Sequence, residues 1–236
     1  MENMDSSLLN ELDSVEKKSL GIVLDIGALE GLRKMPIDVF DSTYLSKVHH
    51  TALILCVDIR NFSDFMCSYD EDTVFKIIKL FTSNLLSCIN QFGYGCSYYK
   101  LMGDGALVIW DETTKKAINE ALLIFNSYTE FLNEDLFKPY ANMALAGALV
   151  MEKVFKFEIS AELSELKYRD YIGYGINLAC RLQTLAEANQ LVVNEKLAKS
   201  GAIPFRVINS PKLQKELNML KGVMKEDRKQ TLFYGN

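Results

Sequence analysis

The chain has 236 residues, of which 49% are hydrophobic, so it is long enough to bury a full core as one large domain, or as one domain plus an extension. Its 26 basic residues are outnumbered by 31 acidic ones, and no segment is dominated by lysine and arginine. The net charge of −5 argues against duplex nucleic acid as the main partner. A nucleotide remains compatible with it, because local charge can differ from net charge.

The cysteines and histidines give little support for a disulfide framework or a zinc site. No Cys-x-x-Cys pair is present, and the cysteines are odd in number: Cys56, Cys67, Cys88, Cys96 and Cys180. Because several lie in apolar stretches, we expect buried thiols in a reducing compartment. The two histidines, His49 and His50, are adjacent and are expected to be solvated.

The first part of the chain is predicted to be an extension. Residues 1–48 begin with an acidic, polar stretch that has helical spacing and are then interrupted by glycines. The start does not resemble a signal peptide, and no apolar run approaches the roughly 18 residues of a membrane span. We therefore expect a cytoplasmic protein with no membrane span, a partly helical extension over residues 1–48 and one folded domain over residues 49–236.

The folded domain is predicted to begin with a strand, a helix and a hairpin. "TALILCVD", residues 51–58, is typical of a buried strand, and residues 71–92 carry apolar side chains at helical spacing. In "SYYKLMGDGALVIW", residues 97–110, Asp-Gly between two apolar runs is a strong hairpin signal. A second amphipathic helix is predicted over residues 113–133.

The later elements are predicted in the same way. Residues 141–159 are interpreted as a strand pair with a turn near Glu152, residues 160–169 as a loop, and residues 170–188 as a loop that becomes a helix. "QLVVN" and the segment around Thr231 to Tyr234 are predicted as short strands. This order favours an α+β fold with helices on one face of a largely antiparallel sheet. Neither a Rossmann nor a P-loop motif is present.

Two aspartates are candidate metal ligands. Asp58 ends the first predicted strand, and Asp104 lies at the tip of the hairpin. If the strand neighbours the hairpin, both carboxylates project from one edge of the sheet. That pair suits Mg²⁺ or Mn²⁺, which also take phosphate oxygens as ligands. Taken one at a time, each aspartate is better explained as a strand-end cap or a turn former.

A third stretch, "DYIGYGINLACRL", adds a second kind of polar pair. Asn177 and Arg181 are four residues apart in a predicted helix, so both lie on one face, one turn apart. Arginine offers fixed donors to phosphate oxygens. The alternative is a solvated helix face that carries one asparagine and one arginine.

Three segments in order, "CVDIRNFSDF", "YKLMGDG" and "DYIGYGINLACRL", resemble motifs of the class III nucleotidyl cyclases. "LKG", residues 220–222, with a predicted strand after it, resembles that family's closing element. The resemblance covers about residues 50–236 and implies a ferredoxin-like α+β domain with a mostly antiparallel sheet and flanking helices. It also implies conversion of a nucleoside triphosphate to a 3′,5′-cyclic monophosphate and pyrophosphate, with two Mg²⁺ or Mn²⁺ ions per site.

The resemblance assigns roles to individual residues. Asp58 and Asp104 match the metal ligands, with the Ile59 carbonyl as a further contact. Arg181 matches the arginine that stabilises charge on the α-phosphate, and Asn177 matches the asparagine that positions the ribose.

The resemblance also assigns a phosphate-binding loop to residues 61–63, and this loop departs from the family pattern at one position. Backbone N–H groups of Asn61, Phe62 and Ser63 would face the β- and γ-phosphates. The family's usual glycine is replaced here by Asn61, which tolerates positive φ better than most residues. Asparagine at this place, and the small build without a sensor domain, resemble the pyrimidine cyclases of the Pycsar anti-phage systems.

The resemblance also implies an assembly. In the family the metal aspartates come from one subunit and the asparagine–arginine pair from its partner. Because this chain holds both halves, we expect a head-to-tail homodimer with two equivalent sites and an inactive monomer. In the anti-phage interpretation, the partner downstream would be an effector that binds the cyclic nucleotide.

Lys100 and Asp170 fall where the family's adenylate cyclases carry a Lys/Asp pair that reads adenine. A donor beside an acceptor matches the edges of adenine and cytosine, whereas guanine and uracil show the reverse pattern. The sequence therefore favours ATP and CTP and does not separate them; Asn61 and the architecture favour CTP. The alternative interpretation is that Lys100 is a strand lysine that reaches solvent and that Asp170 is a loop carboxylate.

Two other classes of function stay open. The chain could be a degenerate cyclase that binds nucleotide only as a regulator, although all the site positions are filled. It could also be a structural interaction module, in which Asp104 has no biochemical role. A diguanylate cyclase is disfavoured, because its Gly-Gly-Asp/Glu-Glu-Phe hairpin is absent and Met102-Gly103-Asp104-Gly105 stands there.

Overall fold

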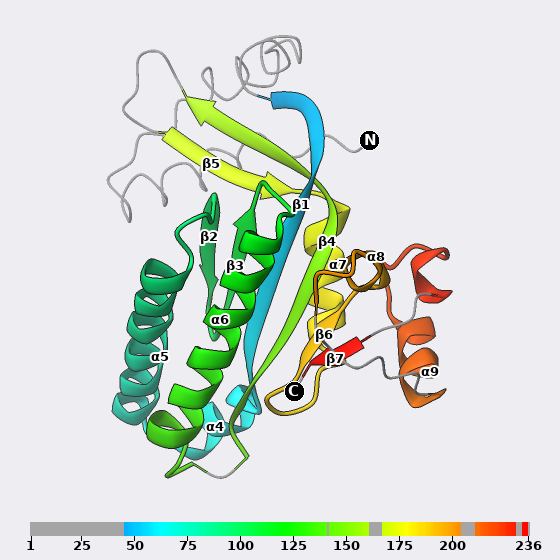
Figure 1. Ribbon diagram of the computed structural model, residues 1–236. Helices are drawn as coiled ribbons and strands as arrows, with labels where there is room; N and C mark the ends of the chain where they lie inside the picture. The colour runs from blue at the N-terminus through cyan, green and yellow to red at the C-terminus, as the bar shows by residue number, and fades with distance from the viewer. Residues whose placement is uncertain (1–44, 141, 161–166, 204–210, 230–232, 236) are drawn as a thin grey trace, which may run out of the picture. The chain divides into compact units, whose positions relative to one another are not determined.

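The computed structural model describes residues 45–140, 142–160, 167–203, 211–229 and 233–235. Residues 1–44 of the predicted extension over residues 1–48 lie outside the described residues. Seven described strands form one sheet in the order β2-β3-β1-β4-β6-β7, with β5 paired to β4 (Figure 1). The chain runs through β1 (Leu45–Arg60), β2 (Tyr98–Met102), β3 (Gly105–Trp110), β4 (Ala144–Ser160), β5 (Lys167–Ile172), β6 (Leu191–Val193) and β7 (Phe233–Gly235).

The sheet is mostly antiparallel, as predicted. β3 pairs antiparallel with both β1 and β2, and the β4–β5 and β6–β7 pairs are also antiparallel. β4 and β6 pair in parallel. Along β1, Leu55 lies opposite Val108 and Asp58 opposite Gly105, so the predicted strand and the predicted hairpin are neighbours.

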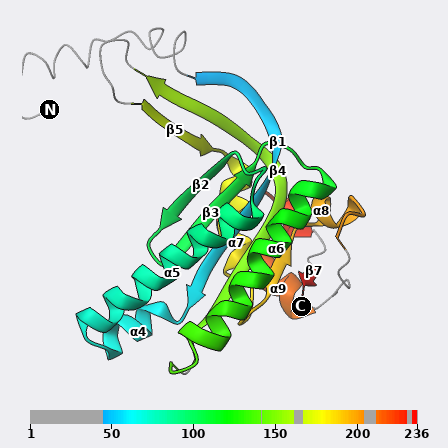
Figure 2. The same ribbon diagram turned by 60° about the vertical axis from the view of Figure 1, so that its left-hand side comes forward.

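Helices cover both faces of the sheet, so the expectation of one covered face was wrong. α5 (Glu71–Phe92) and α6 (Lys115–Phe131) lie side by side on one face (Figure 2). α7 (Tyr174–Gln183) and α9 (Pro211–Met219) cover the other face. Alternate β1 residues enter the two cores, Leu53 and Leu55 on one side and Ile54 and Cys56 on the other. This double burial explains why the strand reads as one continuous apolar run.

The two long helices begin and end where local chemistry requires. The Asp70 side chain accepts a hydrogen bond of 2.9 Å from the Thr73 amide and caps α5. Thr114 caps α6 by accepting from the amide of Ala117. The helices predicted over residues 71–92 and 113–133 are therefore confirmed, the second ending in a π-helical turn, Leu132–Leu136.

Between residues 142 and 188 the described residues differ from the prediction, and residues 161–166 of the predicted loop lie outside the described residues. β4 is one continuous strand through Glu152, not a strand pair, and its distal part pairs with β5, placing Phe155 opposite Ile172. Together with the start of β1, these two strands extend as an arm beyond β2 and β3 (Figure 1). Charged residues that suggested a turn are tolerated because this arm is partly exposed, as the 40% exposure of Phe155 illustrates. The segment predicted to enter α7 as a loop is β5, which ends at Ile172.

Several smaller features were not predicted or differ. The short helices α4 (Phe62–Ser68) and α8 (Glu195–Lys199) were missed, as was α9. The cysteines are free thiols, but only Cys56 is buried; Cys67 is exposed, and the other three are half-buried. His50 is half-buried, with Nε2 2.9 Å from the Asp111 carboxylate, rather than solvated. Among the helices described, none combines the length and the apolar character needed to cross a membrane.

Candidate active site

The hairpin tip brings Asp104 to the end of β1. The Ile59 amide donates a hydrogen bond of 3.1 Å to the Asp104 carbonyl, directly after Asp58. Gly103 supplies the positive φ, 71°, that the first residue of this two-residue turn needs. A side chain at Gly105 would place its Cβ 2.7 Å from the Val57 carbonyl oxygen, so only glycine permits this close approach of the strands.

The pKa of Asp58 shows that its charged form is disfavoured by burial and by a second carboxylate nearby. Burial, and then the charge of Asp104, raise the pKa of Asp58 from 3.8 to about 6. Arg60, the Ile59 amide and the Gln183 side chain act in the opposite direction. A cation between the two carboxylates would relieve both the desolvation and the repulsion.

The donor set fits a hard divalent cation. Within the described residues, no group of three or more Asp, Glu, His or Cys side chains could hold a metal without help. Two carboxylates and an adjacent backbone carbonyl would leave several coordination positions of the ion to water and phosphate oxygens. This is the coordination that Mg²⁺ and Mn²⁺ favour. Asp58, Asp104 and Ile59 are therefore the residues that would hold the ions.

The turn between β1 and α4 enters the helix through a residue in a left-handed conformation. Asn61 adopts the left-handed conformation, φ 61° and ψ 19°, immediately before α4. Its side chain donates a hydrogen bond of 2.6 Å to the carbonyl of Asn142. Phe62 is buried and anchors the helix, whereas Ser63 is exposed. Amides in the first turn of a helix have no intrahelical acceptor, so those of Phe62 and Ser63 are placed to bind an anion.

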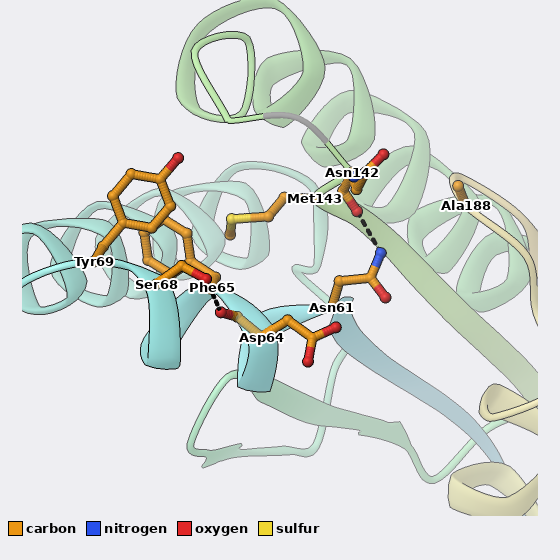
Figure 3. A pocket seen from close by; sticks show the side chains of 8 residues that line it. All are labelled: Asn61, Asp64, Phe65, Ser68, Tyr69, Asn142, Met143 and Ala188. Carbon is orange, nitrogen blue, oxygen red and sulfur yellow. Dashed lines mark hydrogen bonds between the residues drawn. The ribbon is translucent and has the colours of Figure 1, made fainter.

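A cavity of about 590 Å³ lies beside this loop. Figure 3 shows the Asn61 side chain directed at Asn142, with the rings of Phe65 and Tyr69 stacked at 4.6 Å on the other side. Its lining includes Asn61 but neither Asp58 nor Asp104. The cavity therefore borders the turn at Asn61, and the carboxylate pair is not part of its lining.

Lys100 and Asp170 are brought into direct contact. The Lys100 Nζ lies 2.7 Å from Asp170 Oδ2, and the Tyr98 hydroxyl donates to Oδ1 at 2.8 Å. The backbone amide of Tyr171 also donates to Oδ1. The Asp170 side chain is 10% exposed and that of Lys100 44%, so the pair presents its lysine side to solvent.

Residues that sequence reasoning missed hold this pair in place. The rings of Tyr98 and Tyr171 pack at 5.2 Å, and the Tyr171 hydroxyl donates to Asp111 at 2.7 Å. Burial acts to raise the pKa of Asp111, but hydrogen bonds from Tyr171, His50 and Lys156 outweigh it, and the pKa is lowered. The period of two along a strand places Tyr98 on the face of Lys100 and could have identified it. No local pattern marks Asp111.

Asn177 and Arg181 lie together on the exposed side of α7. Neither side chain has a hydrogen-bond or ion-pair partner among the described residues, whereas Leu178 and Leu182 on the other side are buried. Gly175 allows the helix to approach the sheet, because an added Cβ would lie 2.9 Å from the side chain of Ile54. The predicted pair thus shares one face and is available to a second molecule.

Comparison with known proteins places the fold. No family model and no curated protein matches the sequence. Among solved structures, the adenylyl cyclase CyaB from P. aeruginosa is similar over 79% of this chain and 93% of its own, with a TM-score of 0.61 and 13% identity. The guanylate cyclase domain of RhGC from Catenaria anguillulae, solved with GTP, covers 79% of this chain and 96% of its own, with a TM-score of 0.56 and 13% identity.

A bacterial light-regulated adenylyl cyclase gives the same result. It is similar over 80% of this chain and 90% of its own, with a TM-score of 0.55 and 19% identity. At these identities the likeness concerns the fold. The described domain therefore has the α+β fold of the adenylyl and guanylyl cyclase catalytic domains, with a mostly antiparallel sheet and flanking helices, as the sequence motifs predicted.

Proposed function

We propose that this chain is a nucleotidyl cyclase that converts a nucleoside triphosphate to a 3′,5′-cyclic monophosphate and pyrophosphate. The observation that carries the proposal is the meeting of Asp58 and Asp104 at one sheet edge, beside a left-handed turn that opens a helix. The cyclase fold supports it. Pyrophosphate leaves as the ribose 3′-oxygen attacks the α-phosphate, so the site must hold both ends of this displacement.

The carboxylate pair would hold two Mg²⁺ or Mn²⁺ ions, with the Ile59 carbonyl as a further ligand. When bound, the ions supply charge that favours the ionised 3′-hydroxyl and the leaving pyrophosphate. The chain's own contribution is to keep the two carboxylates adjacent. The backbone bond from Ile59 to Asp104 fixes this adjacency, and the charge of Asp104 adds to the effect of burial in raising the pKa of Asp58.

The phosphate loop would bind the triphosphate tail. The amides of Asn61, Phe62 and Ser63 would face the β- and γ-phosphates, while burial of Phe62 keeps the turn rigid. Preorganised donors of this kind contribute about 3–4 kcal/mol of transition-state stabilisation each. The exposed Ser63 hydroxyl would be free to rotate towards the same oxygens.

Asn177 and Arg181 would serve the site of a second copy of this chain. Arg181 would stabilise the charge that grows on the α-phosphate, and Asn177 would position the ribose. Both side chains are exposed and lack a partner among the described residues of their own chain. A head-to-tail homodimer with two shared sites follows from this division, and a monomer would be inactive.

The Lys100–Asp170 pair would read the base. Lysine donates and aspartate accepts, which matches the acceptor and amino group of adenine or cytosine. A mismatched buried edge costs about 1–3 kcal/mol, which disfavours GTP and UTP. We favour CTP and a cyclic CMP product that signals to an effector in anti-phage defence, because Asn61 stands where glycine is usual. ATP is the second candidate, which the same donor–acceptor pair supports equally.

The test is incubation of the protein with Mn²⁺ and each of the four triphosphates, followed by mass identification of products. Asp104→Asn is the matched control, since it removes the charge and keeps the shape. Cyclic CMP from the wild type alone supports the proposal, and cyclic AMP transfers it to an adenylate cyclase. Nucleotide binding without turnover of any of the four would favour a degenerate regulator.

A further inference from the structure

Two thiols from distant parts of the chain lie against each other beneath the proposed site. Cys56 on β1 and Cys180 on α7 have their sulfur atoms 3.7 Å apart, with the Cys56 thiol as donor. Cys56 is 3% exposed, and Cys180 is half-buried at the edge of the same core. Among the described residues, no other two cysteines are joined by a hydrogen bond.

The two positions lie on the two elements that carry the proposed site residues of this chain. Side chains alternate along a strand, so Cys56 and Asp58 lie on the same face of β1. Cys180 directly precedes Arg181 in α7. A covalent bond between these sulfurs would therefore join the strand of the carboxylate pair to the helix that carries Asn177 and Arg181.

We propose that Cys56 and Cys180 are a site of reversible oxidation, at which a peroxide converts the two thiols to a disulfide. In the first step the Cys180 sulfur attacks the peroxide O–O bond, giving a sulfenic acid and one water. In the second step the Cys56 sulfur attacks that sulfenic sulfur, the S–S bond forms, and a second water leaves. Two thiols lose two electrons and two protons, and the peroxide is reduced to two waters.

Position decides which thiol reacts first. Cys180 is the more exposed of the two, and Cys56, buried behind it, is the resolving thiol. The more accessible sulfur meets the peroxide first, so the sulfenic acid forms on Cys180.

Disulfide formation would change the geometry of α7. A disulfide holds its sulfurs about 2.05 Å apart, so the present separation of 3.7 Å must shorten by roughly 1.6 Å. Side-chain rotation and a shift of α7 against β1 share this movement. Misplacement of a catalytic group by about 1 Å costs roughly a hundredfold in rate. This consequence rests on the proposed function, whereas the disulfide itself does not.

The experiment uses the full chain with Cys67→Ser, which removes the exposed thiol and prevents disulfides between molecules. The native protein is titrated with hydrogen peroxide, its free thiols are counted, and a tryptic digest is searched for a peptide that links Cys56 to Cys180. Cys180→Ser and Cys56→Ala, each in the same background, are the test variants. Cys88→Ser is the matched control that keeps the pair.

The expected result is a loss of two thiols, the linked peptide and full reversal by dithiothreitol, in the background protein and the control only. Turnover should fall at least tenfold on oxidation and recover on reduction. Thiols that stay reduced, or Cys180 that stops at sulfenic or sulfinic acid, would overturn the proposal. A linked peptide in a protein that turns over no triphosphate would leave the oxidation site intact and refute the cyclase assignment. Formation of the disulfide with unchanged turnover would refute the coupling to α7.

Discussion

The amide of Ile59 donates a hydrogen bond of 3.1 Å to the carbonyl of Asp104, and this contact fixes the end of β1 against the hairpin tip. The two residues are 45 positions apart in the sequence, so neither local segment creates the site alone. This contact holds the carboxylates of Asp58 and Asp104 close together, so that burial and then the charge of Asp104 raise the pKa of Asp58. The proposed metal site and the hairpin are thus one structural unit.

Asp58→Asn should stabilise the metal-free protein at neutral pH. The pKa of Asp58 is raised to about 6 in the folded chain, so the folded state binds the proton more tightly than the unfolded state. The stability contributed by this group is fully present below pH 3.8 and is lost as pH rises through 6. After allowance for solvent screening, removing the charge should raise the free energy of unfolding by about 1 kcal/mol at pH 7.5.

Urea unfolding in EDTA at pH 5 and pH 7.5 measures this difference. The exposed Asp64 supplies a matched control through Asp64→Asn, which should leave the pH dependence of the wild type unchanged. The same Asp58→Asn variant should lose the rise in melting temperature that Mn²⁺ gives the wild type. An identical pH dependence in Asp58→Asn and the wild type would show that the carboxylate is not strained.

Gly105→Ala should damage the site much more than Gly103→Ala. At Gly105 the new Cβ would meet backbone oxygen at 2.7 Å, and forcing the strands apart should cost about 1–3 kcal/mol. At Gly103 the space is open, so only the positive φ of 71° is strained, at about 1 kcal/mol. Melting temperatures and Mn²⁺ affinity measure both effects. Equal Mn²⁺ affinities in the two variants would contradict the close approach at Gly105.

Asn61→Gly should keep the phosphate loop, and Asn61→Ala should not. Glycine adopts the left-handed conformation freely, whereas alanine is strained by about 1 kcal/mol there. Both variants lose the side-chain bond to Asn142, which makes them a matched pair. The expected readout is a triphosphate KM several-fold higher for Asn61→Ala than for Asn61→Gly. Similar KM values would indicate that the left-handed turn is not needed for binding.

Asp170→Asn should reduce discrimination between triphosphates. The substitution removes the charge that Lys100 faces at 2.7 Å and turns an acceptor into a mixed donor and acceptor. Preference for the best substrate over GTP should fall about tenfold to a hundredfold in kcat/KM. Tyr98→Phe, which keeps the ring and removes one bond to Asp170, should have a smaller effect in the same direction. Unchanged preference in both variants would exclude this pair from base recognition.

Much of the fold followed from local pattern. The helix over residues 71–92 was predicted from its apolar periodicity, and the hairpin from Asp-Gly between two apolar runs. In the structure the two turn residues are Gly103 and Asp104, one position earlier. The strand β4 was predicted wrongly because its distal part leaves the core, where charged residues no longer indicate a turn. The second helical face was missed because it depends on α7 and α9, which are far from β1 in the sequence.

The residues of the site also divide into those that the local sequence identifies and those that only the packing of distant segments brings together. Asp58, Asp104 and Asn61 stand at element ends, where motif and turn chemistry identify them directly. Tyr98 follows from strand alternation once Lys100 is suspected. The contact between Cys56 and Cys180 joins positions 124 residues apart, and only the packing of α7 on the sheet brings it about.

The most direct test of a cyclase with shared sites is complementation between two inactive variants. Asp104→Asn lacks one half of the site and Arg181→Ala the other, so each alone should be inactive. When equal amounts are mixed, half of the dimers are mixed and each has one intact site, which should restore about a quarter of the wild-type rate of cyclic nucleotide formation. A mixture that stays inactive while wild-type protein in parallel turns over its triphosphate would contradict a site built from two copies of this chain.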